Sequence, residues 1–247
     1  MTPFESVGFP FRSDSDYDDA VPAVLDRMMA DAERVPCPAG AEGWSYRDPS
    51  GAGLLAFFSK DADAGTRSLS CLKPVFYGGS RQPVSTGPLV EAEDCSFCDV
   101  ARVDVLKKSG DVAYGAVVRI SDPYFRRFSW KAGTLGLMQG TLFGLEMDPW
   151  KREGTDSGRI RSLGEVGFLP TGADQDPPLP EAVVAGRVLH SERRRNALGG
   201  AEFVWARVDT DDTEYDLVLP TSLCPDAPAP GTILQVAGRL YARRFRQ

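Results

Sequence analysis

The chain has 247 residues, of which 42% are hydrophobic and 26% are charged, and its formal net charge is −7. This balance is typical of a globular protein with a core and excludes general disorder. The negative charge provides no overall attraction to nucleic acids or anionic membranes, and no apolar run reaches the roughly 20 residues of a membrane-spanning helix. The N-terminus lacks the pattern of a secretory signal, so we expect a cytoplasmic protein.

The first part of the chain predicts one helix and several strands. From Tyr17 to Val35, apolar residues recur at spacings of three and four, which predicts an amphipathic helix. Trp44–Asp48 and Leu54–Ser59 flank the turn sequence PSGAG and predict a β-hairpin. Ser68–Phe76 predicts a further strand, and the glycines and prolines of residues 78–88 interrupt the pattern.

The middle of the chain predicts more strands. Cys98–Leu106 and Val112–Ile120 alternate between apolar and polar residues on either side of a KKSGD turn. Thr134–Met147 is apolar but has a glycine at every fourth position, which favours a bent strand or a strand pair over a helix. We find no internal repeat in the sequence.

The last segment predicts a small all-β unit. Its alternating runs are separated by turn residues and are Val183–Leu189, Glu202–Asp209, residues 214–220 and Thr232–Tyr241. Four to five strands in about 65 residues are typical of a small barrel or sandwich of the OB-like type.

The predicted fold class is therefore α+β, predominantly β. We expect a mixed α+β unit at residues 1–150, a proline- and glycine-rich linker at residues 151–180, and a small β-barrel-like unit at residues 181–247.

The cysteines leave three interpretations open. Five cysteines are an odd number, thinly spread, which favours reduced thiols over a disulfide framework. Cys95 and Cys98 form a CxxC pair, a spacing found in redox and zinc sites, but no second pair accompanies it. Free thiols are favoured over a redox pair and over a metal site.

No set of residues predicts catalysis. His190 is the only histidine, and no G-x-S-x-G sequence is present. Glu91, Glu93 and Asp94 cluster without a clear partner. We therefore predict no catalytic residue, no metal ligand and no cofactor.

The best candidates for ligand binding lie in the C-terminal unit. They combine basic, amide and aromatic side chains and are Arg193, Arg194, Arg195, Asn196 and Trp205. Basic groups beside aromatic residues such as Phe203 and Tyr241 suggest binding of single-stranded nucleic acid. Glu181–Gln247 has nine basic and nine acidic residues, however, and a neutral unit argues against that partner.

The C-terminal pattern is similar to that of an uncharacterised actinobacterial protein family. The matching positions are Gly186, Val188, Glu192, Arg194, Asn196, Gly200, Phe203, Trp205, Val208, Thr210, Asp216, Val218, Pro228, Gly231, Gly238, Arg239 and Leu240. This resemblance implies the architecture and no established activity.

A fainter resemblance concerns the N-terminal part. A helix followed by RDPSGAGLLAF, from Arg47 to Phe57, resembles the βαβββ modules of glyoxalase-like proteins. In that family a metal-binding Glu lies on the strand after the turn, but here the strand reads LLAFFSK. The resemblance therefore implies a related fold without the metal chemistry.

These observations favour a non-catalytic, cytoplasmic binding or protein-interaction protein. The alternatives are an enzyme derived from a glyoxalase-like module and a single-stranded nucleic-acid-binding protein that uses the C-terminal unit.

Overall fold

The computed structural model describes residues 1–11, 13–37, 40–60, 67–91, 99–122, 131–148, 166–211 and 213–245. The helices in this part of the chain are the 3-10 helix η1 (Glu5–Val7) and α1 (Asp14–Asp31). The strands are β1 (Glu33–Val35), β2 (Ala41–Arg47), β3 (Ala52–Lys60), β4 (Arg67–Phe76), β5 (Gln82–Glu91), β6 (Asp99–Leu106), β7 (Val112–Ile120), β8 (Leu135–Met147), β9 (Gly167–Leu169), β10 (Glu181–Arg195), β11 (Glu202–Asp209), β12 (Glu214–Pro220) and β13 (Ile233–Arg244). Strands predominate, which confirms the predicted α+β class. No helix within these ranges is long and apolar enough to cross a membrane.

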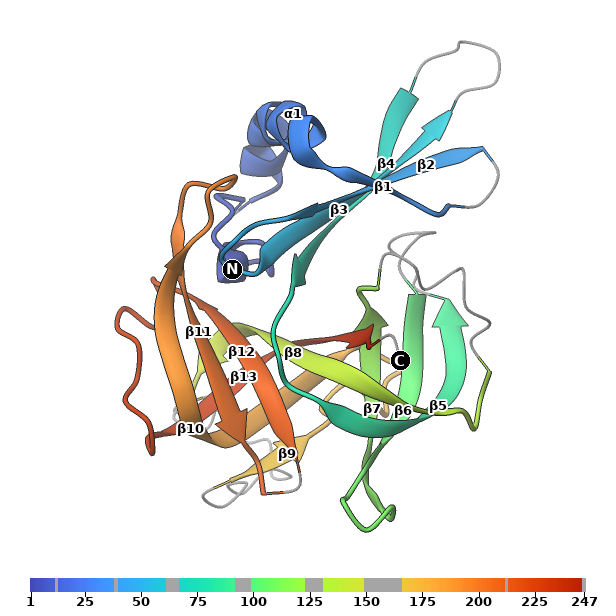
Figure 1. Ribbon diagram of the computed structural model, residues 1–247, viewed down its shortest axis with the longest axis vertical. Helices are drawn as coiled ribbons and strands as arrows, with labels where there is room; N and C mark the ends of the chain where they lie inside the picture. Colours follow the sequence, from blue (N-terminus) through green and yellow to red (C-terminus); the bar gives the residue numbers. More distant parts are fainter. Residues whose placement is uncertain are drawn as a thin grey trace.

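The N-terminal layer consists of α1 and an antiparallel sheet with the strand order β1-β2-β3-β4 (Figure 1). The Ser13 hydroxyl caps α1 by accepting a hydrogen bond from the backbone N–H of Asp16. The helix ends at Asp31, earlier than predicted, because residues 33–35 pair with β2 instead. The hairpin predicted from PSGAG is confirmed as β2 and β3.

The remaining described strands form one continuous sheet that closes into two rings. In the first ring, β5, β6, β7, β13 and β8 pair in this order and β8 pairs with β5. In the second ring, β10, β11, β12, β8 and β13 pair in this order and β13 pairs with β10. Figure 1 shows β8 and β13 running from one ring into the other.

The two halves of this sheet have the same topology. Strands β5 to β8 and strands β10 to β13 each form a three-strand antiparallel meander followed by a long strand. In each half the third strand pairs in parallel with the long strand of the other half, β7 with β13 and β12 with β8. The first strand of each half also carries a bulge at its pairing with the second strand. The structure therefore contains a repeat that the sequence did not reveal.

Alternation along the strands separates the interior of the rings from their outer surface. On β11, Val204, Ala206 and Val208 belong to an interior cluster that includes residues of both rings. Phe203 and Trp205 point outward, into a second cluster shared with α1, η1 and β3. The N-terminal layer therefore packs on the outer surface of the second ring, and each large side chain buried there contributes about 1.5–3 kcal/mol.

The expected units at residues 1–150 and 181–247 both contribute strands to this one sheet. Residues 181–247 supply four strands of the second ring, and among the described strands β8 is the one that completes it. Within the expected linker, residues 167–169 form β9, which pairs with β10. The change from one sheet to the other instead falls between Phe76 and Gln82.

Candidate ligand-binding site

Two of the predicted ligand-binding residues, Arg194 and Trp205, lie against each other. The guanidinium carbon of Arg194 is 4.0 Å from the centre of the Trp205 ring. Arg194 Nη1 donates a hydrogen bond of 2.8 Å to the carbonyl oxygen of Ser50, and its guanidinium forms an ion pair with Glu192. Arg194 thus joins β10 to the β2–β3 turn of the N-terminal layer.

Asn196 has a structural role at the turn after β10. It is fully buried, and its Nδ2 donates a hydrogen bond of 2.7 Å to the carbonyl oxygen of Val7. Its Oδ1 accepts a hydrogen bond from the backbone N–H of Gly199. Its amide is therefore occupied in holding the turn against the N-terminal segment.

Arg193 and Arg195 are exposed because they alternate with Arg194 along the strand. Arg193 forms an ion pair of 2.6 Å with Glu202. The structure therefore brings Arg194 and Trp205 together, buries Asn196, and leaves Arg193 and Arg195 as surface cations on the opposite face.

The aromatic residues expected to stack on bases are not accessible. Phe203, Trp205 and Tyr241 are 0%, 7% and 3% exposed and belong to the cluster beneath the N-terminal layer. A stacking platform needs an open ring face, so these three residues do not provide one.

A different group of arginines and rings lies where the N-terminal layer meets the first ring. It alternates in the order Arg47, Tyr77, Arg243, Phe245, Arg81, and we call it the arginine ladder. Tyr77 has Arg47 at 4.9 Å and Arg243 at 5.0 Å from its ring centre. Phe245 has Arg243 at 5.5 Å and Arg81 at 4.9 Å. These distances are within the range of cation–π attraction.

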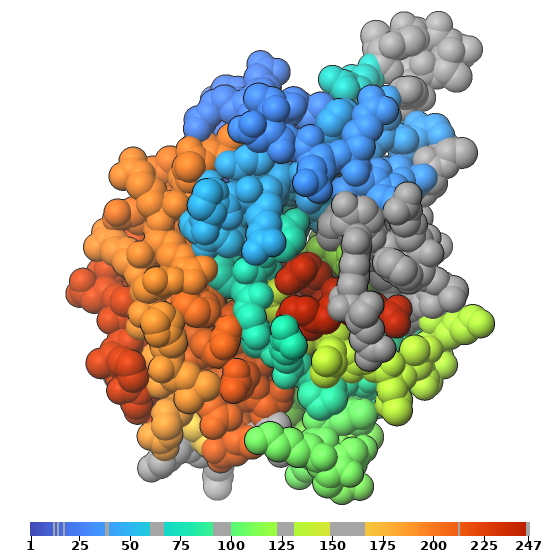
Figure 2. Space-filling model, in the orientation of Figure 1, coloured from blue at the N-terminus to red at the C-terminus, as the bar shows by residue number. Residues whose placement is uncertain are grey.

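The ladder is assembled from three distant parts of the sequence. Arg47 ends β2, and Tyr77 and Arg81 lie in the segment between β4 and β5. Arg243 lies near the end of β13, and Phe245 directly follows that strand. In Figure 2 this C-terminal end (red) surfaces beside the β4–β5 segment (teal), below the N-terminal layer (blue).

Gln139 fixes the orientation of Arg243. Gln139 is 1% exposed, and its Oε1 accepts hydrogen bonds from Arg243 Nε at 3.2 Å and Nη2 at 2.9 Å. Its Nε2 donates to the carbonyl oxygen of Phe76 and to Thr141 Oγ1. The guanidinium is therefore held at the centre of the ladder by a buried amide.

The ladder concentrates positive charge. Burial lowers the pKa of Arg243, and the positive charge of Arg47 acts in the same direction, whereas Tyr77 and the carboxylates of Asp122 and Asp216 partly oppose this shift. Burial raises the pKa of Tyr77, whose hydroxyl lies 3.0 Å from Ser45 Oγ.

The sequence analysis did not identify the arginine ladder. The signal was present as Tyr77 and Arg81 in one short segment and as Arg243 and Phe245 in another. Without the strand order, nothing showed that these two segments meet.

The other residues considered for catalysis or metal binding do not form a common site in the described part of the chain. Among the described residues, no three His, Cys, Asp or Glu side chains come together in a way that could hold a metal ion. His190 is exposed and lies beside Trp205, with ring centres 5.2 Å apart. Cys95, Cys98, Glu93 and Asp94 lie outside the described residues, so the redox and metal interpretations of the CxxC pair stay predictions.

Comparisons with models of protein families, with curated proteins and with solved structures find no match for this chain.

Proposed function

We propose that this chain is a non-catalytic binding protein whose arginine ladder takes up an acidic segment of a partner protein. One observation carries the proposal: three guanidinium groups lie on two aromatic rings. Like charges placed close together repel each other unless a partner neutralises them, and a carboxylate matches the guanidinium fork.

The rings of the ladder favour acidic groups over nucleic-acid bases. Tyr77 and Phe245 each have two guanidinium groups over the ring, which leaves little ring surface for a base. The net charge of −7 on the whole chain also opposes a polyphosphate backbone, whereas a short acidic segment can make local contacts.

The expected affinity is moderate and depends on salt. Partly exposed charge pairs contribute about 0.2–1 kcal/mol each, so useful binding needs several of them at once. Gln139 holds Arg243 in place before the ligand arrives, which reduces the entropy lost on binding.

Fluorescence anisotropy with labelled probes tests the proposal. A short polyglutamate peptide should bind the whole chain at low ionic strength and more weakly at physiological ionic strength, and a polylysine peptide of equal length should not bind. A single-stranded oligonucleotide that binds more tightly than polyglutamate would overturn the acidic-protein partner and favour the nucleic-acid alternative. Absence of polyglutamate binding even at low ionic strength would overturn the proposal.

Matched variants locate the site. Arg47→Gln, Arg81→Gln and Arg243→Gln should each weaken polyglutamate binding about two- to fivefold. Arg195→Gln removes the same charge from an exposed site outside the ladder and should leave the affinity unchanged. An equal loss in Arg195→Gln would show that the ladder is not the binding site.

A further inference from the structure

Helix α1 presents carboxylates on its outer face. Among its 18 residues the helix has six aspartates and one basic residue, Arg27. Val21 and Met28 are buried against the N-terminal layer, whereas Asp19 and Asp26 lie on the opposite side of the helix and are exposed. The outer face of α1 is therefore an acidic segment with a fixed shape.

The two exposed carboxylates of this face are well placed to contact another surface together. Asp19 and Asp26 are separated by two helical turns, about 10 Å along the axis, and so project on the same side. Pro22 and Ala23 lie between them, and these short side chains allow a partner surface to approach. The Arg27 guanidinium is engaged elsewhere, since its Nη2 donates a hydrogen bond of 2.9 Å to the carbonyl oxygen of Ala197.

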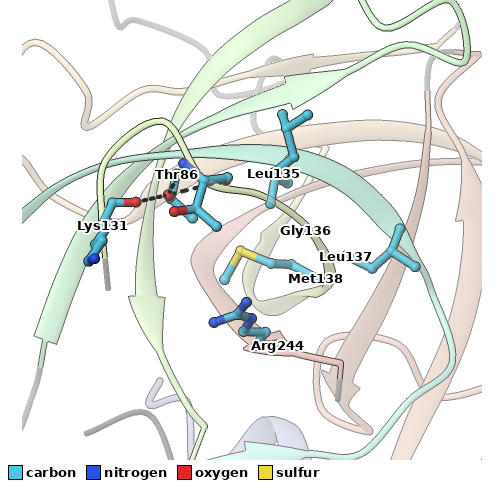
Figure 3. A pocket seen from close by; sticks show the side chains of 9 residues that line it. Thr86, Lys131, Leu135, Gly136, Leu137, Met138 and Arg244 are labelled. Carbon is cyan, nitrogen blue, oxygen red and sulfur yellow. Dashed lines mark hydrogen bonds between the residues drawn. The ribbon is translucent and has the colours of Figure 1, made fainter. Parts of the chain in front are cut away.

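The arginine ladder lies on the outer surface of the first ring. Met138 and Ala242 belong to the interior cluster, so the residues that follow them, Gln139 and Arg243, point outward. Arg244 instead borders a small hollow at the end of the ring, beside Met138 (Figure 3). Successive arginines of β13 therefore serve different surfaces, and the ladder faces away from the ring interior.

The ladder offers several cations to one partner. Arg47 and Arg81, at its two ends, are exposed, and Arg243 lies between them, held by Gln139. The three guanidinium groups are spread over the rings of Tyr77 and Phe245. Separate cations on a preformed surface match separate carboxylates on a rigid helix better than they match a single anion.

The sheet β1–β4 separates the helix from the ladder within one chain. Trp44 and Tyr46 pack against the cluster that contains the buried side of α1. Ser45 and Arg47 alternate with them and point to the other face, where both contact Tyr77. Figure 1 shows α1 above this sheet and the C-terminal end of β13 below it. The helix therefore cannot cover the ladder of its own chain.

From this complementarity we infer that the ladder takes up the outer face of α1 from a second copy of this chain. The inference rests on the function proposed above and identifies the acidic partner. Because the helix and the ladder are different surfaces, the contact is heterologous and joins copies head to tail. The net charge of −7 on each copy opposes association, so the contact is weak.

Small-angle X-ray scattering of the whole chain measures this association. At about 0.1 M salt, repulsion between distant charges is screened while close pairs still attract, so the mean mass should rise with protein concentration. A few exposed charge pairs predict a dissociation constant of about 0.1–1 mM, which sets the concentrations to use. At about 1 M salt the chain should be monomeric.

Two double variants identify the surfaces. The helix variant, Asp19→Asn with Asp26→Asn, removes the carboxylates of α1. The ladder variant, Arg47→Gln with Arg81→Gln, removes the two exposed cations and leaves Arg243 and Gln139 in place. Each double variant should raise the dissociation constant for self-association at least about fivefold.

A mixture of the two double variants tests the head-to-tail contact. The helix variant keeps its ladder and the ladder variant keeps its helix, so they should form an equimolar complex although neither associates alone. As a control, Asp174→Asn with Asp226→Asn removes the same charge from exposed positions outside the helix. This control should associate at least as strongly as the wild type.

Polyglutamate separates this inference from the proposed function, because the helix variant should still bind it. A wild type that binds polyglutamate but stays monomeric at about 0.1 M salt would overturn the second copy as partner and leave the acidic-segment function standing. Failure of both measurements would overturn both proposals. The inference is also overturned if the helix variant associates like the wild type, or if the two double variants form no complex.

Discussion

The indole N–H of Trp205 donates a hydrogen bond of 2.8 Å to Oδ1 of Asp216, a carboxylate with no exposed surface. Its Oδ2 accepts a hydrogen bond of 2.9 Å from the backbone N–H of Ser80, and Arg207 Nε lies 3.9 Å from Oδ1. Asp216 therefore connects the second ring to the segment between β4 and β5. Because Tyr77 and Arg81 lie in that segment, the same carboxylate helps to position the arginine ladder.

Removing the Asp216 carboxylate should destabilise the protein. Asp216→Ala leaves the Trp205 and Ser80 donors without their acceptor, and each unsatisfied buried group costs about 1–3 kcal/mol. Asp216→Asn keeps one oxygen acceptor and should lose less. Urea unfolding followed by tryptophan fluorescence measures both variants. A loss below about 1 kcal/mol for Asp216→Ala would contradict this role.

The two glycines next to Ser80 should differ in their tolerance of a side chain. A Cβ at Gly78 would collide with the buried carboxylate of Asp216, whereas a Cβ at Gly79 would meet the movable end of Arg207. Gly78→Ala should therefore cost about 1–3 kcal/mol and Gly79→Ala clearly less. Gly115→Ala, where a Cβ would make an ordinary contact, serves as the control in the same unfolding experiment. Equal losses at Gly78 and Gly79 would contradict the close approach of Gly78 to Asp216.

Local sequence patterns were sufficient to predict most elements of the fold. The period of residues 17–35 identified α1, and the PSGAG turn identified the β2–β3 hairpin. β5 was missed because Pro83 and Gly87 look like breaks in a strand. Pro83 lies next to the start of β5 and pairs with Leu137, and Gly87 lies at the bulge, where it approaches the backbone of Arg102.

The pairing of strands that lie far apart in the sequence could not be predicted from local sequence patterns. Thr134–Met147 was expected to form a bent strand or a strand pair, and residues 135–147 form one strand that pairs with three others. Its glycines allow this crowding, since Gly140 approaches Gln82 and Gly144 approaches Leu219. Such contacts join residues far apart in the sequence, so neither the rings nor the arginine ladder could be predicted from spacing.

The dependence of the second ring on β8 gives a direct prediction for a fragment. Residues 181–247 expressed alone should not unfold cooperatively, because β12 and β13 lose their partner strand and Leu142 no longer fills the interior. Circular dichroism recorded during heating measures whether the fragment unfolds cooperatively. A cooperative transition of the fragment would instead support an independent C-terminal unit.

Stability should fall at alkaline pH through Tyr215. Burial, and then the neighbouring Tyr114, raise the pKa of Tyr215 well above its ordinary value of about 10. The folded protein therefore retains a proton that the unfolded chain loses above about pH 10, so the stabilising effect is complete below that pH and declines as the pH rises. Urea midpoints between about pH 9 and 11 should fall more steeply for the wild type than for Tyr215→Phe. Parallel curves for the two proteins would contradict the raised pKa.

The position of the bound acidic segment tests the central claim most directly. In ¹⁵N NMR of the arginine side chains, addition of polyglutamate should shift the Nε signals of Arg47, Arg81 and Arg243 together, with one common affinity. The signals of Arg193 and Arg195 should stay in place. Shifts at Arg193 and Arg195 without shifts in the ladder, or no shift at any arginine, would contradict the proposed binding site.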